Sequence, residues 1–542
     1  MKLRLPNHIT IYTEKEKFTF TDTQVCKAED ITVSASENAD SLGISLCADT
    51  SAVTYIRLRW NFTYEEKRKE AVRILGDDWE RTYGNSEWRC ISAQRCMPWV
   101  CAVSNGSDAN RDYAGRYTEC FGVKVRPGAL CFWQYETSGV ILWLDVRCGG
   151  MGVILEGRRL ALCDIVFGNY RDMSAFDALK KHYCELCKDP LLVDHKVYGT
   201  NNWYFAYGKS SHEDILKDTA LLAQRCSGLD NPPYMVIDDC WEKNRIDAPW
   251  DELSEGFYDM KLLASQIKDM GVRPGIWIRP LADTKFSTPF TDAQYRNMRN
   301  HEYLDPSHPA ILEFIKSTIN TLVNDWGYTF IKHDFTTWDI FGYWGFEKQN
   351  VLADDGWHFY DRSKTSAEII TNLYRTIYES TRGNALINGC NVMGHLSAGL
   401  HHIQRVGDDT SGLKWERTRN YGVNALAFRL PQHGTMFIAD ADCIGITEHI
   451  RWKMNYEWLK ALAASGTPMF ISPDPKALND EIVEQMIQAY ARSSVQEDVM
   501  IPLDWMENVC PERWLLNGEE VTFSWYPDEG VESFEPKLEP LV

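Results

Sequence analysis

From about residue 196 onward, short apolar runs alternate with amphipathic segments, and this alternation restricts the possible folds more than any other feature of the chain. Eight runs have strand character: 196–205, 234–239, 272–278, 328–335, 385–390, 401–407, 435–440 and 468–472. Six segments between them have helical periodicity: 212–226, 257–270, 308–326, 366–381, 418–430 and 451–465. Strands and helices that alternate over roughly 280 residues predict a (β/α)₈ TIM barrel. A doubly wound sheet is the alternative, but its G-x-G-x-x-G loop does not follow the first strand.

The 542-residue chain is too long for one hydrophobic core, so we expect a multidomain α/β protein. Residues before about 190 contain short strand-like runs separated by turn signals, which indicates a β-sandwich; the runs are 44–50, 52–60, 140–148 and 153–167. A helical segment, 176–190, then ends at a proline. The expected domains are a sandwich over 1–190, a catalytic barrel over 191–493 and a small β element over 494–542, in which 521–527 is a strand candidate.

Composition and charge narrow the classes of partner. The net charge of −20 disfavours nucleic acid and anionic membranes, whereas the 20 Trp and 25 Tyr suit a small neutral ligand such as a sugar, although most aromatics lie in cores. No apolar run reaches membrane-span length and the first residues lack the apolar core of a signal peptide, so we expect a cytoplasmic protein with reduced cysteines. Cys184 and Cys187 form a lone C-x-x-C without a second pair at zinc spacing. A homo-oligomer is possible.

Charged and polar residues gather where the expected barrel strands end. These strand ends read Asn201-Asn202-Trp203, Asp238-Asp239-Cys240-Trp241, Trp277-Ile278-Arg279-Pro280, Lys332-His333-Asp334, Asn388-Gly389-Cys390-Asn391, Arg405-Val406-Gly407-Asp408-Asp409 and Asp440-Ala441-Asp442. The βα loops at these ends form the active face of a TIM barrel. A helix N-cap would explain Asp409 or Asp442 alone, but acids at four of the eight ends favour a functional rim.

Two chemistries use such carboxylates: binding of a divalent metal, and glycosidic cleavage by an acid and a nucleophile. Lys332 lies two residues before Asp334, so both side chains point to the same face of the strand, and a cation there keeps the acid ionised. Arg405 precedes Asp408 in a similar way. Cations placed beside the acids suit a sugar site better than a metal site, and we expect no cofactor and no metal.

Five motifs in register resemble the melibiase-type glycoside hydrolases of clan D, which are families 27 and 36 (α-galactosidases and α-N-acetylgalactosaminidases) and more distantly family 31. The motifs are Ile237-Asp238-Asp239-Cys240-Trp241, the K-x-D of Lys332-His333-Asp334, Arg405-Val406-Gly407-Asp408, Ala439-Asp440-Ala441-Asp442 and the last strand, 464–471. The preceding sandwich is similar to family 36, whereas the IDDCW string is more like family 27.

The resemblance implies double displacement with retention of anomeric configuration. Asp334 would attack the anomeric carbon and Asp408 would act as acid, then base, with Asp409 as the rival for that role. The resemblance implies substrate-binding roles for the other strand-end residues: Trp203, Asp238, Asp239, Trp277, Arg279, Lys332, Asn388, Cys390 and Arg405. The substrate would be a small oligosaccharide or glycoconjugate with a terminal α-linked galactose-type residue.

The chain departs from the family 36 galactosidases at residues 388–391, where Asn-Gly-Cys-Asn replaces Cys-x-Gly-Gly-Gly. Because that loop contacts the 2-position of the sugar, an α-N-acetylgalactosaminide, a β-L-arabinopyranoside or an α-glucoside are alternative substrates. A transglycosylase, a non-catalytic sugar-binding barrel and a metal-dependent barrel enzyme also stay open. The long aromatic segment 338–363 is expected to form an aglycone subsite or lid. Segment 76–84 either reaches over the barrel mouth or is an inter-domain loop without ligand contact.

Overall fold

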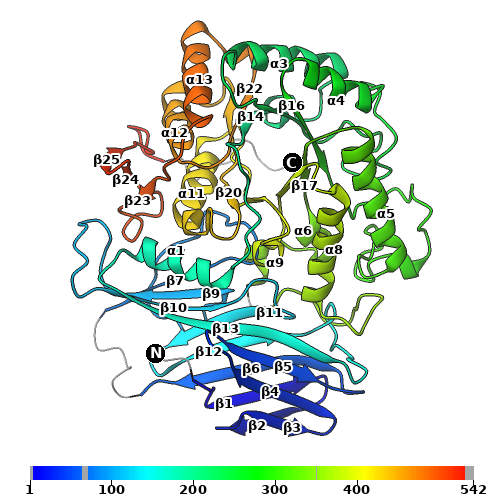
Figure 1. The fold of residues 1–542 in the computed structure, drawn as a ribbon, viewed down its shortest axis with the longest axis vertical. Helices are drawn as coiled ribbons and strands as arrows, with labels where there is room; N and C mark the ends of the chain where they lie inside the picture. Colours follow the sequence, from blue (N-terminus) through cyan, green and yellow to red (C-terminus); the bar gives the residue numbers. More distant parts are fainter. Residues whose placement is uncertain (1–3, 64–70, 350, 532–542) are drawn as a thin grey trace, which may run out of the picture.

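The computed structural model describes residues 4–63, 71–349 and 351–531, so the two chain ends and one residue of segment 338–363 lie outside the described residues. Two antiparallel sheets form the N-terminal part, below the barrel in Figure 1. One has the order β2 (Lys17–Thr21), β1 (His8–Thr13), β6 (Val53–Asn61), β12 (Gly139–Asp145), β11 (Leu130–Glu136), β8 (Met97–Pro98). The other has the order β3 (Val25–Ala28), β4 (Ile31–Glu37), β5 (Leu42–Cys47), β13 (Arg159–Arg171), β10 (Tyr117–Val123), β9 (Val100–Ser104), β7 (Arg73–Gly76).

The two sheets pack as a sandwich around an aromatic core. Alternate residues of β4 and β6 are buried, as expected for strands with one face toward a core. The ring centroid of Trp60 lies 6.2 Å from that of Trp133 and 5.4 Å from that of Phe167, which it meets edge-on. The predicted sandwich is confirmed, although residues 153–158 precede strand β13 rather than belonging to it.

Helix α1 (Ala175–Leu186) covers one face of the sandwich and links it to the barrel. Ser174 caps it by accepting a hydrogen bond from the backbone N–H of Asp177. Gly122 of β10 lies beneath it, and a Cβ there would come within 2.7 Å of His182 Nε2. A glycine is therefore needed for this close approach.

Parallel strands of a curled sheet form the barrel. In chain order they are β14 (Tyr198–Asn201), β15 (Tyr234–Ile237), β16 (Arg273–Ile278), β17 (Phe330–His333), β18 (Leu386–Gly389), β19 (Ile403–Arg405), β20 (Ile438–Asp440), β21 (Cys443–Ile446) and β22 (Met469–Pro473). The seventh predicted strand, 435–440, corresponds to β20, and β21 is a further short strand that was not predicted; Asp442, with a φ of 78°, lies between the two. Strand β20 pairs with β19 and β21 pairs with β22, so these two short strands connect the two sides of the sheet and the predicted barrel is confirmed.

Helices follow the barrel strands, and several begin at a side chain that caps the helix. They are α2 (Trp203–Ala206), α3 (His212–Arg225), α4 (Met260–Asp269), α5 (Pro309–Asn320), α6 (Thr336–Phe341), α7 (Gly345–Lys348), α8 (Ser366–Thr381), α9 (Gly394–Ser397), α10 (Trp415–Arg417), α11 (Asn424–Arg429), α12 (Trp452–Ala464) and α13 (Asp480–Ser493). A π-helical turn, Thr321–Asp325, extends α5, another, Thr418–Val423, precedes α11, and 3₁₀ turns span Ala293–Tyr295, Leu430–Gln432 and Pro475–Ala477. Capping boxes start α3 and α8, at Ser211 and Thr365.

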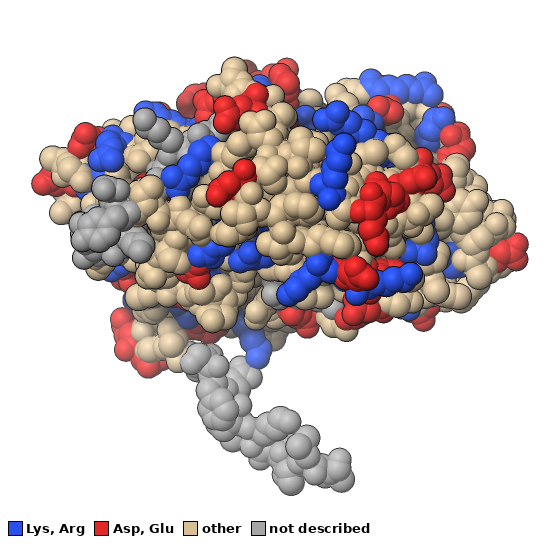
Figure 2. Space-filling model, turned by 90° about the horizontal axis from the view of Figure 1, so that it is seen from below, with Lys and Arg blue, Asp and Glu red and all other residues tan. Residues whose placement is uncertain are grey.

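Three short strands complete the described chain: β23 (Ile501–Pro502), β24 (Arg513–Leu516) and β25 (Glu519–Thr522). Just before β24, Trp505 packs against Trp88 and Phe176 of the sandwich part and against Phe428 of the barrel. This small sheet therefore belongs to a junction that joins both larger domains. Among the described residues, no helix is both long and apolar enough to cross a membrane. On the face drawn in Figure 2, basic and acidic side chains are interspersed.

Candidate active site

Asp334 lies directly after β17, at the barrel mouth. Its backbone N–H donates to the carbonyl of Ile278 (3.0 Å), which continues the pairing of β17 with β16. One carboxylate oxygen accepts from the Phe335 N–H (2.7 Å) and the other from Trp277 Nε1 (3.3 Å). Phe335 has a φ of 64°, which turns the chain sharply after Asp334. Asp334 is 8% exposed, and its two N–H donors fix the orientation of the carboxylate.

Lys332 and Asp238 form an ion pair beneath the mouth. Lys332 Nζ lies 2.7 Å from Asp238 Oδ2, and the same oxygen accepts from Asn201 Nδ2 (2.7 Å). Burial lowers the pKa of Lys332, but Asp238 and other neighbours outweigh it and hold that pKa well above its usual value. The sequence suggests Asp334 as the partner of this lysine; the hydrogen-bonded partner in the structure is Asp238 on β15.

Asp239 shares its environment with a second carboxyl group. Both Asp239 and Glu242 accept from the backbone N–H of Ile246. Burial, followed by the nearby charge of Asp239, raises the pKa of Glu242 to about 9, so the pair holds one proton at neutral pH. Glu242 was not among the residues expected at the site, because it lies one position beyond the strand-end motif.

Arg405, on β19, joins several acids. Its Nη2 lies 2.7 Å from Asp442 Oδ2 and 3.0 Å from Asp409 Oδ1. Burial raises the pKa of Asp409, but the charges of Arg405 and Arg81 outweigh it, and the pKa lies well below its usual value. The two arginines therefore favour the ionised form of Asp409.

Asn388 and Cys390 lie at the end of β18. Asn388 Nδ2 donates to Asp440 Oδ2 (2.8 Å), while its Oδ1 is buried and has no partner among the described residues. The sulfur of Cys390 lies 3.6 Å from Arg81 Nη1 and 3.8 Å from Arg405 Nη1. Burial, followed by the charge of Asp334, raises the pKa of this thiol well above its usual value, so it stays protonated. Cys390 lies where the ends of β17, β18 and β19 converge.

Three further residues that the sequence suggests for substrate binding contact other side chains of the protein. Arg279 forms a buried ion pair with Asp339 (2.5 Å). Trp277 is 2% exposed, and only its Nε1 is directed at Asp334. Trp203 opens helix α2 and packs edge-on against Tyr207, with ring centroids 5.4 Å apart.

The mouth is completed by a segment of the sandwich, residues 77–86, here called the sandwich loop. The N–H of Thr82 donates to the carbonyl of Val406 (2.8 Å), and the N–H of Asp408 donates to the carbonyl of Thr82 (3.1 Å). Arg81 Nη2 lies 2.8 Å from Asp408 Oδ1, and Arg417 Nη2 lies 3.5 Å from Asp408 Oδ2. The loop thus reaches the barrel mouth and contacts the candidate acid.

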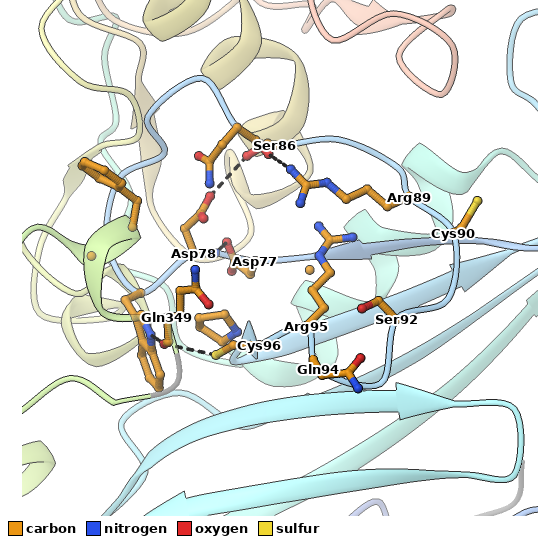
Figure 3. A pocket seen from close by; sticks show the side chains of 16 residues that line it. Asp77, Asp78, Ser86, Arg89, Cys90, Ser92, Gln94, Arg95, Cys96 and Gln349 are labelled. Atoms are coloured by element: carbon orange, nitrogen blue, oxygen red, sulfur yellow. Dashed lines mark hydrogen bonds between the residues drawn. The ribbon is translucent and has the colours of Figure 1, made fainter.

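The outer side of the sandwich loop borders a cavity of ≈ 370 Å³ between sandwich and barrel (Figure 3). Ser86 Oγ donates to Asp78 Oδ2 (3.2 Å) at its wall and lies 2.8 Å from the Thr82 hydroxyl. Asp77 pairs with Arg429 of the barrel (3.4 Å). These contacts fix the outer side of the sandwich loop.

Aromatic residues form a cluster beside the barrel mouth. Tyr83 packs against Phe346 and Trp344, with ring centroids 4.6 and 6.3 Å away, and Trp338 lies 4.6 Å from Trp344. We call these four side chains the aromatic rim. Three of them belong to segment 338–363, which folds partly into helices α6 and α7 rather than into one irregular loop.

Comparison with solved structures finds the same fold in α-galactosidases. An α-galactosidase from Thermus thermophilus, solved with p-nitrophenyl α-D-galactopyranoside, is 16% identical and has a TM-score of 0.60, with 95% of this chain and 98% of that chain covered. A GH36 α-galactosidase from Geobacillus stearothermophilus is 13% identical with a TM-score of 0.61 (95% and 79% covered). An α-galactosidase from Lactobacillus brevis is 9% identical with a TM-score of 0.60 (97% and 74% covered). No protein-family model and no curated protein matches the sequence. At these identities the likeness establishes a shared fold of sandwich and barrel.

Proposed function

We propose that this chain is a retaining, exo-acting glycoside hydrolase that removes terminal α-linked galactose-type residues. One observation carries the proposal: Asp334 and Asp408 follow two strands of one barrel, at the end where TIM-barrel enzymes have their active sites, and each carboxylate is fixed by donors. The shared fold with α-galactosidases supports it. Those proteins were solved with sugars that include stachyose and raffinose.

In the proposed first step, Asp334 attacks the anomeric carbon and the bond to the leaving oxygen breaks. The N–H donors from Phe335 and Trp277 hold the attacking carboxylate in one orientation. Asp408 gives its proton to the leaving oxygen, so the aglycone departs as a neutral alcohol. A glycosyl ester on Asp334 and an ionised Asp408 result.

In the second step Asp408 takes a proton from water, and the resulting hydroxide attacks the anomeric carbon. The ester to Asp334 breaks and the sugar leaves with its original configuration, because two displacements have occurred. Asp408 regains the proton it needs for the next cycle. One carboxyl group therefore serves as acid and base in turn.

The groups beneath the two carboxylates would bind sugar hydroxyls. Asp238 and Lys332 offer an acceptor and a donor side by side. Asn388 adds a buried carbonyl oxygen without a partner among the described residues, which a hydroxyl would satisfy. Most charges of the site are already paired with one another, so a neutral sugar fits better than an ionic substrate.

The test is hydrolysis of p-nitrophenyl glycosides by the purified chain. We expect release from the α-galactoside that is lost in Asp334→Ala and kept in Asp292→Ala, a matched change at an exposed aspartate. Release only from the α-N-acetylgalactosaminide, β-L-arabinopyranoside or α-glucoside would move the proposal to that sugar. If the wild-type chain leaves every substrate of the panel intact, the proposal of a glycosidase is contradicted.

A further inference from the structure

Arg81 is the one cation of the sandwich loop that reaches the candidate acid. Its side chain is 7% exposed, and its Nη2 lies 2.8 Å from Asp408 Oδ1. Its other terminal nitrogen lies 3.6 Å from Cys390 Sγ and 3.7 Å from Asp409 Oδ1. The guanidinium carbon lies 5.3 Å from the ring centroid of Trp344 and 5.4 Å from that of Tyr83. The polar contacts at the edge of the guanidinium group and its contacts with the two rings restrict the conformations of this side chain.

The residue before Arg81 fixes the loop to the barrel. Glu80 is fully buried and accepts from Asn391 Nδ2 (2.6 Å), from the N–H of Gly345 (3.0 Å) and from the Tyr83 hydroxyl. Its carbonyl accepts from Arg429 Nη1 (2.9 Å). The donors come from the loops after β17 and β18, from the barrel helix α11 and from the loop itself.

The residue after Arg81 is held equally well. Thr82 exchanges backbone hydrogen bonds with Val406 and Asp408, the segment that carries the acid. Gly407 between them has no room for a side chain, since a Cβ would lie 2.1 Å from the carbonyl oxygen of Tyr421. The backbone after Arg81 is therefore fixed to the backbone around Asp408, and the residue before Arg81 is fixed to other parts of the barrel.

From this geometry we propose that Arg81 is a positioning residue that aligns the Asp408 carboxyl group with the leaving oxygen of the substrate. The inference rests on the proposed function and adds to it a contribution from the sandwich. Without Arg81, the cation that stays paired with Asp408 among the described residues is Arg417, whose side chain is 39% exposed and whose Nη2 lies 3.5 Å from Asp408 Oδ2. An exposed, more distant arginine orients a carboxylate weakly.

Arg81 acts through the acid, so its effect must depend on how much the leaving group needs a proton. A sugar or methanol leaving group needs full protonation, whereas 2,4-dinitrophenolate leaves without it. For Arg81→Gln we expect kcat/KM to fall about 10- to 100-fold on methyl α-galactoside or raffinose and less than about 3-fold on 2,4-dinitrophenyl α-galactoside, because general-acid assistance contributes 10²- to 10⁴-fold. Arg81→Lys, which keeps the charge, should restore part of the loss on the poor leaving groups.

Arg89→Gln is the matched control, because Arg89 is an exposed arginine close to the sandwich loop that pairs with Glu87. It should leave both rates unchanged. Thermal unfolding of each variant shows whether it is folded; if Arg81→Gln is not, Arg81→Lys carries the test through the ratio of its rates on the two classes of substrate.

Equal losses on both classes of leaving group, or no loss on either, overturn the role of Arg81 while leaving the proposed function intact. A wild-type chain that cleaves neither class overturns the proposed function itself, and the role of Arg81 with it. A selective loss on the poor leaving groups, partly restored by lysine, is the result that the geometry predicts.

Discussion

The strand ends of the barrel and the sandwich loop bring charged side chains to the same mouth, but different contacts hold them there. Lys332 and Asp334 are placed by the register of one strand, β17, between its two neighbours. Glu80 and Arg81 are placed by contacts with residues far along the chain; Glu80 and Asn391 are 311 positions apart. The barrel can therefore place the carboxylates at its strand ends alone, whereas the surroundings of Asp408 require the sandwich to be docked.

The largest expected effect is that of Asp408→Ala, which removes the residue where the two regions meet. We expect kcat/KM on raffinose to fall about 10²- to 10⁴-fold, the usual contribution of general acid–base catalysis. Azide should speed turnover of an activated galactoside, because a small anion completes the second step without a base. Asp409→Ala is the matched change. A greater loss for Asp409→Ala, measured with the same substrate, would show that Asp409 and not Asp408 is the acid.

A change confined to the barrel comes next. Lys332→Met leaves Asp238 buried, at 4% side-chain exposure, without its cation. Removing one partner of a buried ion pair costs about 3–5 kcal/mol, so the free energy of unfolding in urea should fall by that amount. The double variant with Asp238→Asn should recover part of it. If the single variant is as stable as the wild type, the ion pair of Lys332 and Asp238 does not stabilise the barrel.

A change confined to the sandwich loop should cost less. Glu80→Gln keeps the shape of the side chain but presents an amide where a carboxylate accepts three hydrogen bonds. We expect a loss of about 1–3 kcal/mol in unfolding free energy, because at least one buried donor loses its acceptor. Glu87→Gln, which removes a surface ion pair with Arg89, should be nearly neutral. Equal stability of the two variants would show that Glu80 does not fix the loop.

The last expected effect is a pH dependence of stability within the barrel. Because the pKa of Glu242 is raised to about 9 in the folded protein, this group binds a proton that the unfolded chain has released above about pH 4.5. It therefore makes stability fall as pH rises from about 5 to 9, by at most about 1.4 kcal/mol per pH unit. Glu242→Gln should remove this slope, as measured by urea unfolding across that range. A variant with the same slope as the wild type would mean that Asp239 and Glu242 do not share a proton.

Sequence periodicity was sufficient to predict the sandwich, the barrel and the order of the barrel strands. It failed where local chemistry overrides the pattern. Residues 203–205 continue an apolar run but form helix α2, since Asn201 ends the strand. Helix α13 was missed, although Asn479 caps it and Ile482, Met486 and Tyr490 form a helical stripe on its buried side.

The candidate site was predictable to the extent that it follows strand register. The carboxylates at the strand ends lie together because the carboxyl ends of the parallel strands meet at one end of the barrel. The partners of these groups were not predictable: Arg279 pairs with Asp339, and Lys332 with Asp238. Arg81 lies in a segment that is unusually polar and aromatic, and this composition was the only sequence signal for it. No periodicity relates a sandwich loop to a barrel strand more than 300 residues later.

The central claim, that Asp334 is the nucleophile of an α-galactosidase, is tested most directly by trapping the glycosyl ester. The purified chain would be incubated with a fluorinated α-galactosyl substrate that carries an activated leaving group, because fluorine slows both steps and the activated leaving group keeps formation of the intermediate faster than its hydrolysis. Mass spectrometry of the digested protein should then find one added sugar on the peptide that contains Asp334, and none in Asp334→Ala. A sugar attached elsewhere, or rapid hydrolysis of the parent galactoside by Asp334→Ala, would contradict the account.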